Sequence, residues 1–133
     1  MVAVGAGVEG LKAGGNAATG TAGAAKGPYG HLKDHKSVGP DKVYTSSQKR
    51  NIMAENVKKN GGVIKDDKTG EMLVKPKVYT KGHKPPRNEA QVDHQVPRKP
   101  PTGSGVKPGS NSYSNATVRS RANNIAKSNK VEP

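Results

Sequence analysis

Apolar residues are sparse in this chain, and their spacing predicts one helix in its middle part. Three apolar side chains recur at helical spacing: Ile52, Met53 and Val57. Thr45, with Gln48 three residues later, has the pattern of a capping box, and Gly61-Gly62 is a typical helix end. We therefore predict a helix that begins near Thr45 and ends before residue 61, with the apolar stripe in the core.

Further along the chain, short apolar runs predict strands. The runs at 63–65 and 71–74 flank a glycine-closed turn at 66–70, which is typical of a β-hairpin. Alternating residues predict a strand over 90–96 and a return strand over 116–119. The loop between them, 97–112, is rich in proline and glycine, and loops of this length are usually functional. Ser120 is a good N-cap for a last helix over 121–129.

The first 26 residues are a low-complexity tract of mostly alanine, glycine and threonine. They offer too little apolar surface to offset the entropy of ordering, apart from a short helix over 8–13. We interpret 1–26 as a linker or the end of a preceding domain, and expect the chain to be the C-terminal tip of a larger protein. Residues 27–133 are then one small, loop-rich domain of the α+β class.

Composition narrows the function. Lys and Arg number 23 against 10 Asp and Glu, and the resulting net charge of +13 favours a polyanionic partner. Nucleic acid is favoured over a membrane surface, because no basic amphipathic helix with large apolar residues is present. No run of about 18 apolar residues exists, so we expect no membrane span. The chain has no cysteine, which excludes disulfides and thiolate zinc sites.

An acid and a histidine stand side by side at the end of the predicted strand 90–96. Asn115 follows after the loop, and the last predicted helix offers a further amide oxygen at Asn124 or Asn123. Phosphodiester hydrolysis needs a base that titrates near neutral pH, which His94 supplies, and a cation at the scissile phosphate. Asp93 and an asparagine form an oxygen-only ligand set, which favours Mg²⁺ or Mn²⁺ over Zn²⁺. The alternative is that Asp93-His94 is an ordinary exposed pair.

The order and spacing of four residues resemble the HNH/endonuclease VII superfamily: Asp93, His94, Asn115 and Asn124. Gly82-His83 and Glu89 ahead of them resemble the GH-E type of nuclease domain at the C-termini of bacterial polymorphic toxins. The resemblance implies a ββα-metal core over 89–130, braced by the helix and hairpin that precede it. His83 and Glu89 are then candidate site residues, although His83 also fits a plain loop histidine and Glu89 a strand-entry salt bridge.

The resemblance also implies roles for the four residues. Asp93 binds the metal, and a twist at the strand end brings His94 to the same cation as general base. The carbonyl of Asn115 fixes the tautomer of the base, and Asn124 is the second ligand. The chain lacks the extra histidines of the His-rich members, so zinc dependence is not implied.

Basic residues surround these positions, and we expect them to contact the phosphate backbone of the substrate. The set is Arg98, Lys99, Arg119, Arg121, Lys127 and Lys130. The alternative is a plain solvated face.

These observations predict a metal-dependent endonuclease that cuts DNA. The resemblance implies that it is the toxic domain of a secreted antibacterial effector and acts in the cytoplasm of a target cell. It also implies a cognate immunity protein, acidic because the domain is strongly basic. The alternatives are an RNase of the same fold, a non-catalytic basic protein that binds nucleic acid, and a disordered basic tail that folds on its partner.

Overall fold

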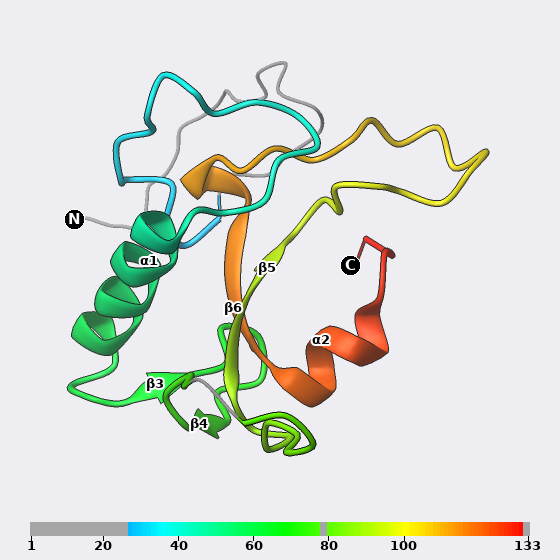
Figure 1. The fold of residues 1–133 in the computed structure, drawn as a ribbon. Helices are drawn as coiled ribbons and strands as arrows, with labels where there is room; N and C mark the ends of the chain where they lie inside the picture. The colour runs from blue at the N-terminus through cyan, green and yellow to red at the C-terminus, as the bar shows by residue number, and fades with distance from the viewer. Residues whose placement is uncertain (1–26, 78–79, 132–133) are drawn as a thin grey trace.

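Two helices lie on opposite sides of a two-stranded antiparallel sheet (Figure 1). The computed structural model describes residues 27–77 and 80–131, so the predictions for 1–26 lie outside the described residues. The elements are α1 (Ser46–Lys59), β3 (Ile64–Lys65), β4 (Met72–Leu73), β5 (Ala90–His94), a 3-10 turn (Tyr113–Asn115), β6 (Ala116–Ser120) and α2 (Arg121–Lys127). The class is α+β, as predicted. Within the described ranges, neither helix is long and apolar enough to cross a membrane.

The local signals in the sequence set the helix starts. The Thr45 side chain accepts from the Gln48 backbone at 3.1 Å, and the Gln48 side chain accepts from the Thr45 backbone at 2.9 Å, which confirms the capping box. Ser120 caps α2 by accepting from the backbone of Asn123 at 3.0 Å. Helix α2 ends two residues earlier than predicted, at Lys127, because Ser128 adopts a positive φ of 55°.

The hairpin β3–β4 and the pair β5–β6 confirm the predicted strands. Ala90 pairs with Ser120, Val92 with Val118 and His94 with Ala116. Because side chains alternate along a strand, Val92 and Val118 turn to the core on the α1 side, whereas Gln91 and Asp93 face α2. The register therefore separates an apolar face from a polar one.

The core is thin, as its composition predicts, and three tyrosines fill part of it. Tyr29, Tyr44 and Tyr113 are buried with Ile52 and Val118 among others. Each hydroxyl finds a partner, as buried tyrosines require: the side chain of Asp67, the carbonyl of Ser112 and the amide of Asn51, respectively. The core therefore combines apolar burial with the polar contacts of its tyrosine hydroxyls.

Candidate functional site

His94 is held by the segment that precedes α1. Its Nε2 lies 2.8 Å from the carbonyl oxygen of Lys42, and its ring centroid lies 4.5 Å from that of Tyr44. A carbonyl only accepts, so Nε2 carries the proton in the neutral ring and Nδ1 keeps its lone pair. The backbone of Lys42, 52 residues away in the chain, thus selects the tautomer. Sequence reasoning missed this contact, which no local pattern signals.

The surroundings of His94 keep its imidazole neutral. Burial lowers its pKa below the ordinary 6.5, and the bond to Lys42 and the charge of Asp93 oppose this shift only in part. A neutral imidazole with a free Nδ1 has the protonation state that a general base needs.

Asn115 closes the long loop rather than orienting the base. It is fully buried, and its Oδ1 accepts from the backbone of Val96 at 2.8 Å. Its Nδ2 donates to the carbonyls of Val96 and Ser110, at 3.0 and 2.9 Å, so one side chain joins both ends of the loop. The predicted role as tautomer selector is therefore corrected: the oxygen of Asn115 is taken by Val96, and Lys42 performs that task.

Glycine is required at the neck of the same loop. Gly109 donates from its backbone to the carbonyl of Pro97 at 2.8 Å, and a Cβ at position 109 would collide with the carbonyl of Val96. The neck is thus too narrow for any side chain at this position.

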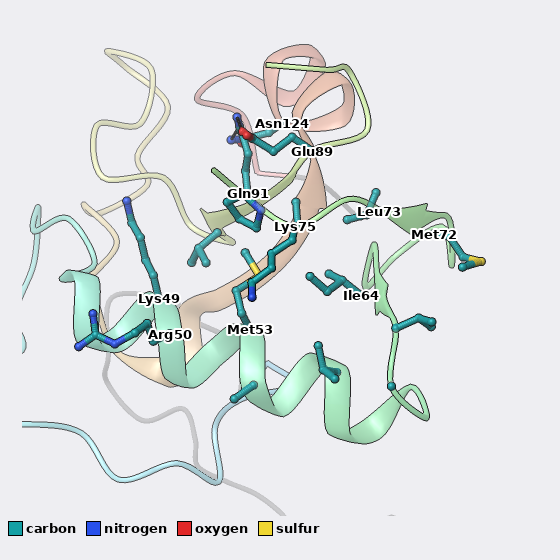
Figure 2. Close-up of a pocket in the computed structure, with 17 residues that line it drawn as sticks. Lys49, Arg50, Met53, Ile64, Met72, Leu73, Lys75, Glu89, Gln91 and Asn124 are labelled. Carbon is teal, nitrogen blue, oxygen red and sulfur yellow. Dashed lines mark hydrogen bonds between the residues drawn. The ribbon is translucent and has the colours of Figure 1, made fainter. Parts of the chain in front are cut away.

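Asn124 and Glu89 meet at one end of a groove beside β5 (Figure 2). Asn124 donates to Oε1 of Gln91 at 2.9 Å, and Gln91 in turn donates to the buried Glu89 carboxylate at 3.4 Å. Asn123 instead donates to Asp66 at 3.0 Å. The sequence predicted either Asn123 or Asn124 as a metal ligand, and Asn124 is the one that faces β5.

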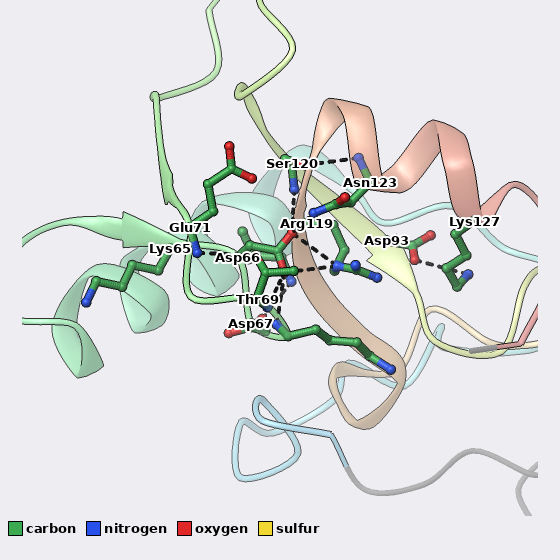
Figure 3. A network of polar contacts seen from close by, with 12 residues as sticks. Lys65, Asp66, Asp67, Thr69, Glu71, Asp93, Arg119, Ser120, Asn123 and Lys127 are labelled. Atoms are coloured by element: carbon green, nitrogen blue, oxygen red, sulfur yellow. Dashed lines mark hydrogen bonds and ion pairs between the residues drawn. The ribbon is translucent and has the colours of Figure 1, made fainter. Parts of the chain in front are cut away.

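Asp93 pairs with a buried lysine from α2 (Figure 3). Its Oδ2 lies 3.1 Å from Nζ of Lys127, whose side chain is only 2% exposed and also donates to the carbonyl of His94 at 2.9 Å. The contact has the distance of an ion pair but not the angles of a hydrogen bond, so Oδ2 is buried without a donor. Burial raises the pKa of Asp93 above the ordinary 3.8, against the charge of Lys127.

The carboxylate and the imidazole leave β5 on opposite sides. Asp93 contacts α2, whereas His94 contacts Lys42 and Tyr44 ahead of α1, as the alternation of a strand dictates. The twist implied by the resemblance, which would turn both groups to one cation, is not the arrangement in the structure. Asn124 shares the α2 side with Asp93, one helical turn before Lys127.

A second acidic centre lies in the turn after β3 (Figure 3). Asp66 is buried and accepts from Nε of Arg119 at 3.1 Å, from the Ser120 backbone at 2.9 Å and from Asn123 at 3.0 Å, as well as from two backbone groups of its own turn. Burial raises the pKa of Asp66, but these donors outweigh it and hold the pKa at about 2. Sequence reasoning identified only a hairpin turn here.

The neighbouring Asp67 completes this network. It accepts from Tyr29 at 2.8 Å, from the backbone of Val118 at 2.7 Å and from Nζ of Lys59 at 2.7 Å. The turn thereby connects α1, Tyr29 and β6. We refer to Asp66, Asp67 and their partners as the Asp66–Asp67 network.

The predicted phosphate-binding cations divide into two groups. Arg119 and Lys127 are 4% exposed and lie in ion pairs with Asp66 and Asp93, so burial removes both from the surface that we expected them to form. The other four reach solvent to different extents: Arg98, Lys99, Arg121 and Lys130. Arg98 and Lys99 lie 3.4 and 3.8 Å from the carboxylate of Asp41.

His83 is exposed, and its Nδ1 lies 2.8 Å from the hydroxyl of Thr80 in the same turn. This contact is local and joins His83 to neither β5 nor α2.

In the ranges 27–77 and 80–131, no three His, Cys, Asp or Glu side chains are close enough to hold a metal ion. The comparisons with known proteins found no matching family profile, no matching curated protein and no matching solved structure.

Proposed function

We propose that the chain is a metal-dependent endonuclease that hydrolyses DNA phosphodiester bonds, with β5, β6 and α2 as a ββα-metal core. The observation that carries the proposal is the state of His94. The carbonyl of Lys42 holds Nε2–H and leaves Nδ1 as a free base, and burial lowers the pKa so that the base is neutral.

The chemical role of His94 follows from this geometry. Its Nδ1 accepts a proton from the water that attacks phosphorus, while the Nε2–H bond to Lys42 holds the ring in place. Positioned general bases contribute about 10²–10⁴-fold to a rate. The ring of Tyr44 limits the motion of the imidazole further.

The donor set fits a hard divalent cation, with Mg²⁺ preferred and Mn²⁺ or Zn²⁺ as alternatives. Oδ2 of Asp93 is buried without a hydrogen-bond donor, and such an oxygen gains most from a cation. Asp93 and Asn124 would hold the ion, which would supply positive charge to the phosphate and the leaving oxygen. Because the His94 side chain leaves β5 on the other side, the proposal requires the end of β5 to turn so that both groups reach one phosphate. Because the ammonium of Lys127 now balances Asp93, it competes with that ion for the carboxylate.

The net charge supports a nucleic-acid substrate. Four of the predicted cations reach solvent and would contact phosphates: Arg98, Lys99, Arg121 and Lys130. The roles as toxic domain of a secreted effector, active in a target-cell cytoplasm and neutralised by an acidic immunity protein, rest on the resemblance alone and belong to the same proposal.

Cleavage of supercoiled plasmid tests the proposal. The purified chain is incubated with Mg²⁺, with EDTA in place of Mg²⁺, and as the variant His94→Ala in Mg²⁺. The matched control is His35→Ala, because the His35 side chain is exposed and bonds only Ser37 among the described residues. We expect nicking by the wild type and His35→Ala in Mg²⁺, and by neither His94→Ala nor the EDTA sample.

Plasmid that stays intact in every lane would contradict the proposed DNase activity. The same four samples are then applied to a folded RNA. Cleavage of RNA that needs His94 would transfer the mechanism to an RNase, and intact RNA would leave a nucleic-acid-binding protein without catalysis.

A further inference from the structure

A groove of about 1190 Å³ runs between α1, the β3–β4 hairpin and β5 (Figure 2). Its floor is apolar and consists of Met53, Val57, Ile64, Leu73 and Val92. Neither Asp93 nor His94 lines it, and the groove meets the proposed metal site only at the end where Asn124 and Glu89 lie.

The free edge of β5 forms one wall of the groove. In an antiparallel pair, alternate residues bond to the partner strand and the residues between them direct N–H and C=O outward. The bonds from Arg121 to Glu89 and from Gln95 to Asn115, at 2.9 and 2.8 Å, place the odd-numbered residues in the β6 ladder. The backbone of Val92 therefore faces away from β6 and toward the groove.

Within the part of the chain that the structure describes, only the beginning of the outer edge of β5 is covered. Ala90 donates to the carbonyl of Val74 at 2.9 Å, and Val74 donates to that of Asn88 at 2.9 Å, which forms one parallel bridge. At Pro76 the chain cannot donate another backbone bond. Among the described residues, no backbone or side-chain group bonds to the N–H or C=O of Val92. An unpaired strand edge beside an apolar floor is the arrangement that accepts an added strand.

The rim of the groove is positively charged. Lys49 and Arg50 from α1, and Lys75 from the chain after β4, are exposed, and none of the three forms an ion pair within the described part of the chain. The acid among the lining residues, Glu89, is 6% exposed and lies at the far end beside Asn124 (Figure 2). Charge complementarity therefore selects an acidic occupant.

We propose that this groove binds an extended acidic segment of a partner protein, which adds to the free edge of β5 as a third strand. Alternate side chains of the segment would fill the apolar floor, and the others would pair with Lys49, Arg50 and Lys75. Single-stranded nucleic acid fits less well, because no aromatic side chain among the described residues lines the groove to stack on bases. The inference does not depend on cleavage.

The test uses the full chain and a blocked peptide of alternating glutamate and valine, followed by amide chemical shifts of the isotope-labelled protein. We expect the largest shifts at Val92 and along the groove side of α1, and slower hydrogen exchange of the Val92 amide. The same peptide with lysine in place of glutamate should bind more weakly. Equal binding of both peptides, shifts located elsewhere, or no shift at all would overturn the proposal.

Three variants sharpen the test. Val92→Pro removes the N–H that faces the groove at a position where an edge strand tolerates proline, and should weaken peptide binding about tenfold, the equivalent of one hydrogen bond. If that variant does not fold, the double variant Lys49→Glu with Lys75→Glu decides, since it should reverse the preference between the two peptides. His94→Ala should bind the acidic peptide as the wild type does, which separates this inference from the proposed cleavage.

Nucleic acid is tested in parallel with an oligothymidine titration. Groove shifts with oligothymidine and none with the acidic peptide would assign the groove to the nucleic acid instead, and would contradict the proposed strand.

Discussion

Two aspartates with little exposure to solvent have opposite surroundings: the side chain of Asp66 is fully buried, and that of Asp93 is 12% exposed. Asp66 accepts hydrogen bonds from Arg119, Ser120 and Asn123 and from its own turn, and its pKa falls to about 2. Asp93 has fewer partners, the ammonium of Lys127 and the adjacent His94; its Oδ2 has no hydrogen-bond donor, and burial raises its pKa. Both carry the same functional group, so the difference lies in the number and geometry of donors around each one.

The comparison separates a structural acid from a candidate ligand. A carboxylate whose lone pairs are all engaged stabilises the fold and has no capacity for a further cation. A carboxylate that is buried and incompletely satisfied costs stability and is typical of sites that bind or react. The predictions below test this division from the largest expected effect to the smallest.

Asp66→Ala should lower the free energy of unfolding by about 3–5 kcal/mol, because it removes the buried carboxylate that pairs with Arg119 and accepts from Ser120 and Asn123. Urea denaturation followed by circular dichroism measures the change. Glu71→Ala, on the exposed side of the same turn, is the control and should change stability by less than about 0.5 kcal/mol. Equal losses in the two variants would remove Asp66 from its structural role.

As the pH falls, the contributions of the two aspartates to the free energy of unfolding should change in opposite directions. The pKa of Asp66 is lowered from 3.8 to about 2, so its roughly 2 kcal/mol of stabilisation is present above pH 3.8 and is lost as the pH falls toward 2. The pKa of Asp93 is raised, so its protonation favours the folded state as the pH falls toward 3.8.

The measurement is the difference in unfolding free energy between the wild type and each Asp→Asn variant as a function of pH. It should shrink for Asp66→Asn and grow in favour of the wild type for Asp93→Asn as the pH falls. Parallel curves would contradict the comparison.

Lys127→Met should raise the affinity for Mn²⁺ by about tenfold, because one like charge close to a cation costs about 1–4 kcal/mol at a partly solvated site. Isothermal titration calorimetry measures this without any nuclease activity. Lys130→Met is the matched control, since Lys130 is exposed and should leave the affinity unchanged. An unchanged or weaker affinity in Lys127→Met would mean that the ammonium does not compete for Asp93.

The acid limb of the cleavage rate should lie below pH 6.5, because burial lowers the pKa of His94 and the rate falls only when the imidazole is protonated. Tyr44→Leu opens the site and should move the limb toward 6.5, by less than about one pH unit. Tyr44→Phe keeps the ring and is the control. A limb at or above 6.5 in the wild type would exclude His94 as the base that limits the rate.

Local patterns predicted the elements, and long-range contacts decided the site. The Thr45 capping box, the Ser120 cap and the hairpin turn each depend on neighbouring residues, so all three could be recognised in the sequence. The bond from His94 to the Lys42 carbonyl and the pair of Asp66 with Arg119 join residues more than 50 positions apart, and only the fold creates them.

Asn115 shows the intermediate case. The resemblance implied that its carbonyl fixes the tautomer of the base, but its burial and its bonds to Val96 and Ser110 assign it to loop closure. The sequence likewise predicted Lys127 to be a surface cation. Composition gives the number of charges but not which of them are buried in ion pairs, as Lys127 is with Asp93.

The most direct test of the division between the two aspartates is paramagnetic broadening of amide signals by Mn²⁺ in the isotope-labelled full chain. We predict that substoichiometric Mn²⁺ broadens Asp93, His94 and Asn124 first and leaves Asp66 and Asp67 sharp, and that Asp93→Asn abolishes the effect. Broadening centred on the Asp66–Asp67 network, or none at any concentration that keeps the protein folded, would contradict the assignment of Asp93 as the metal ligand.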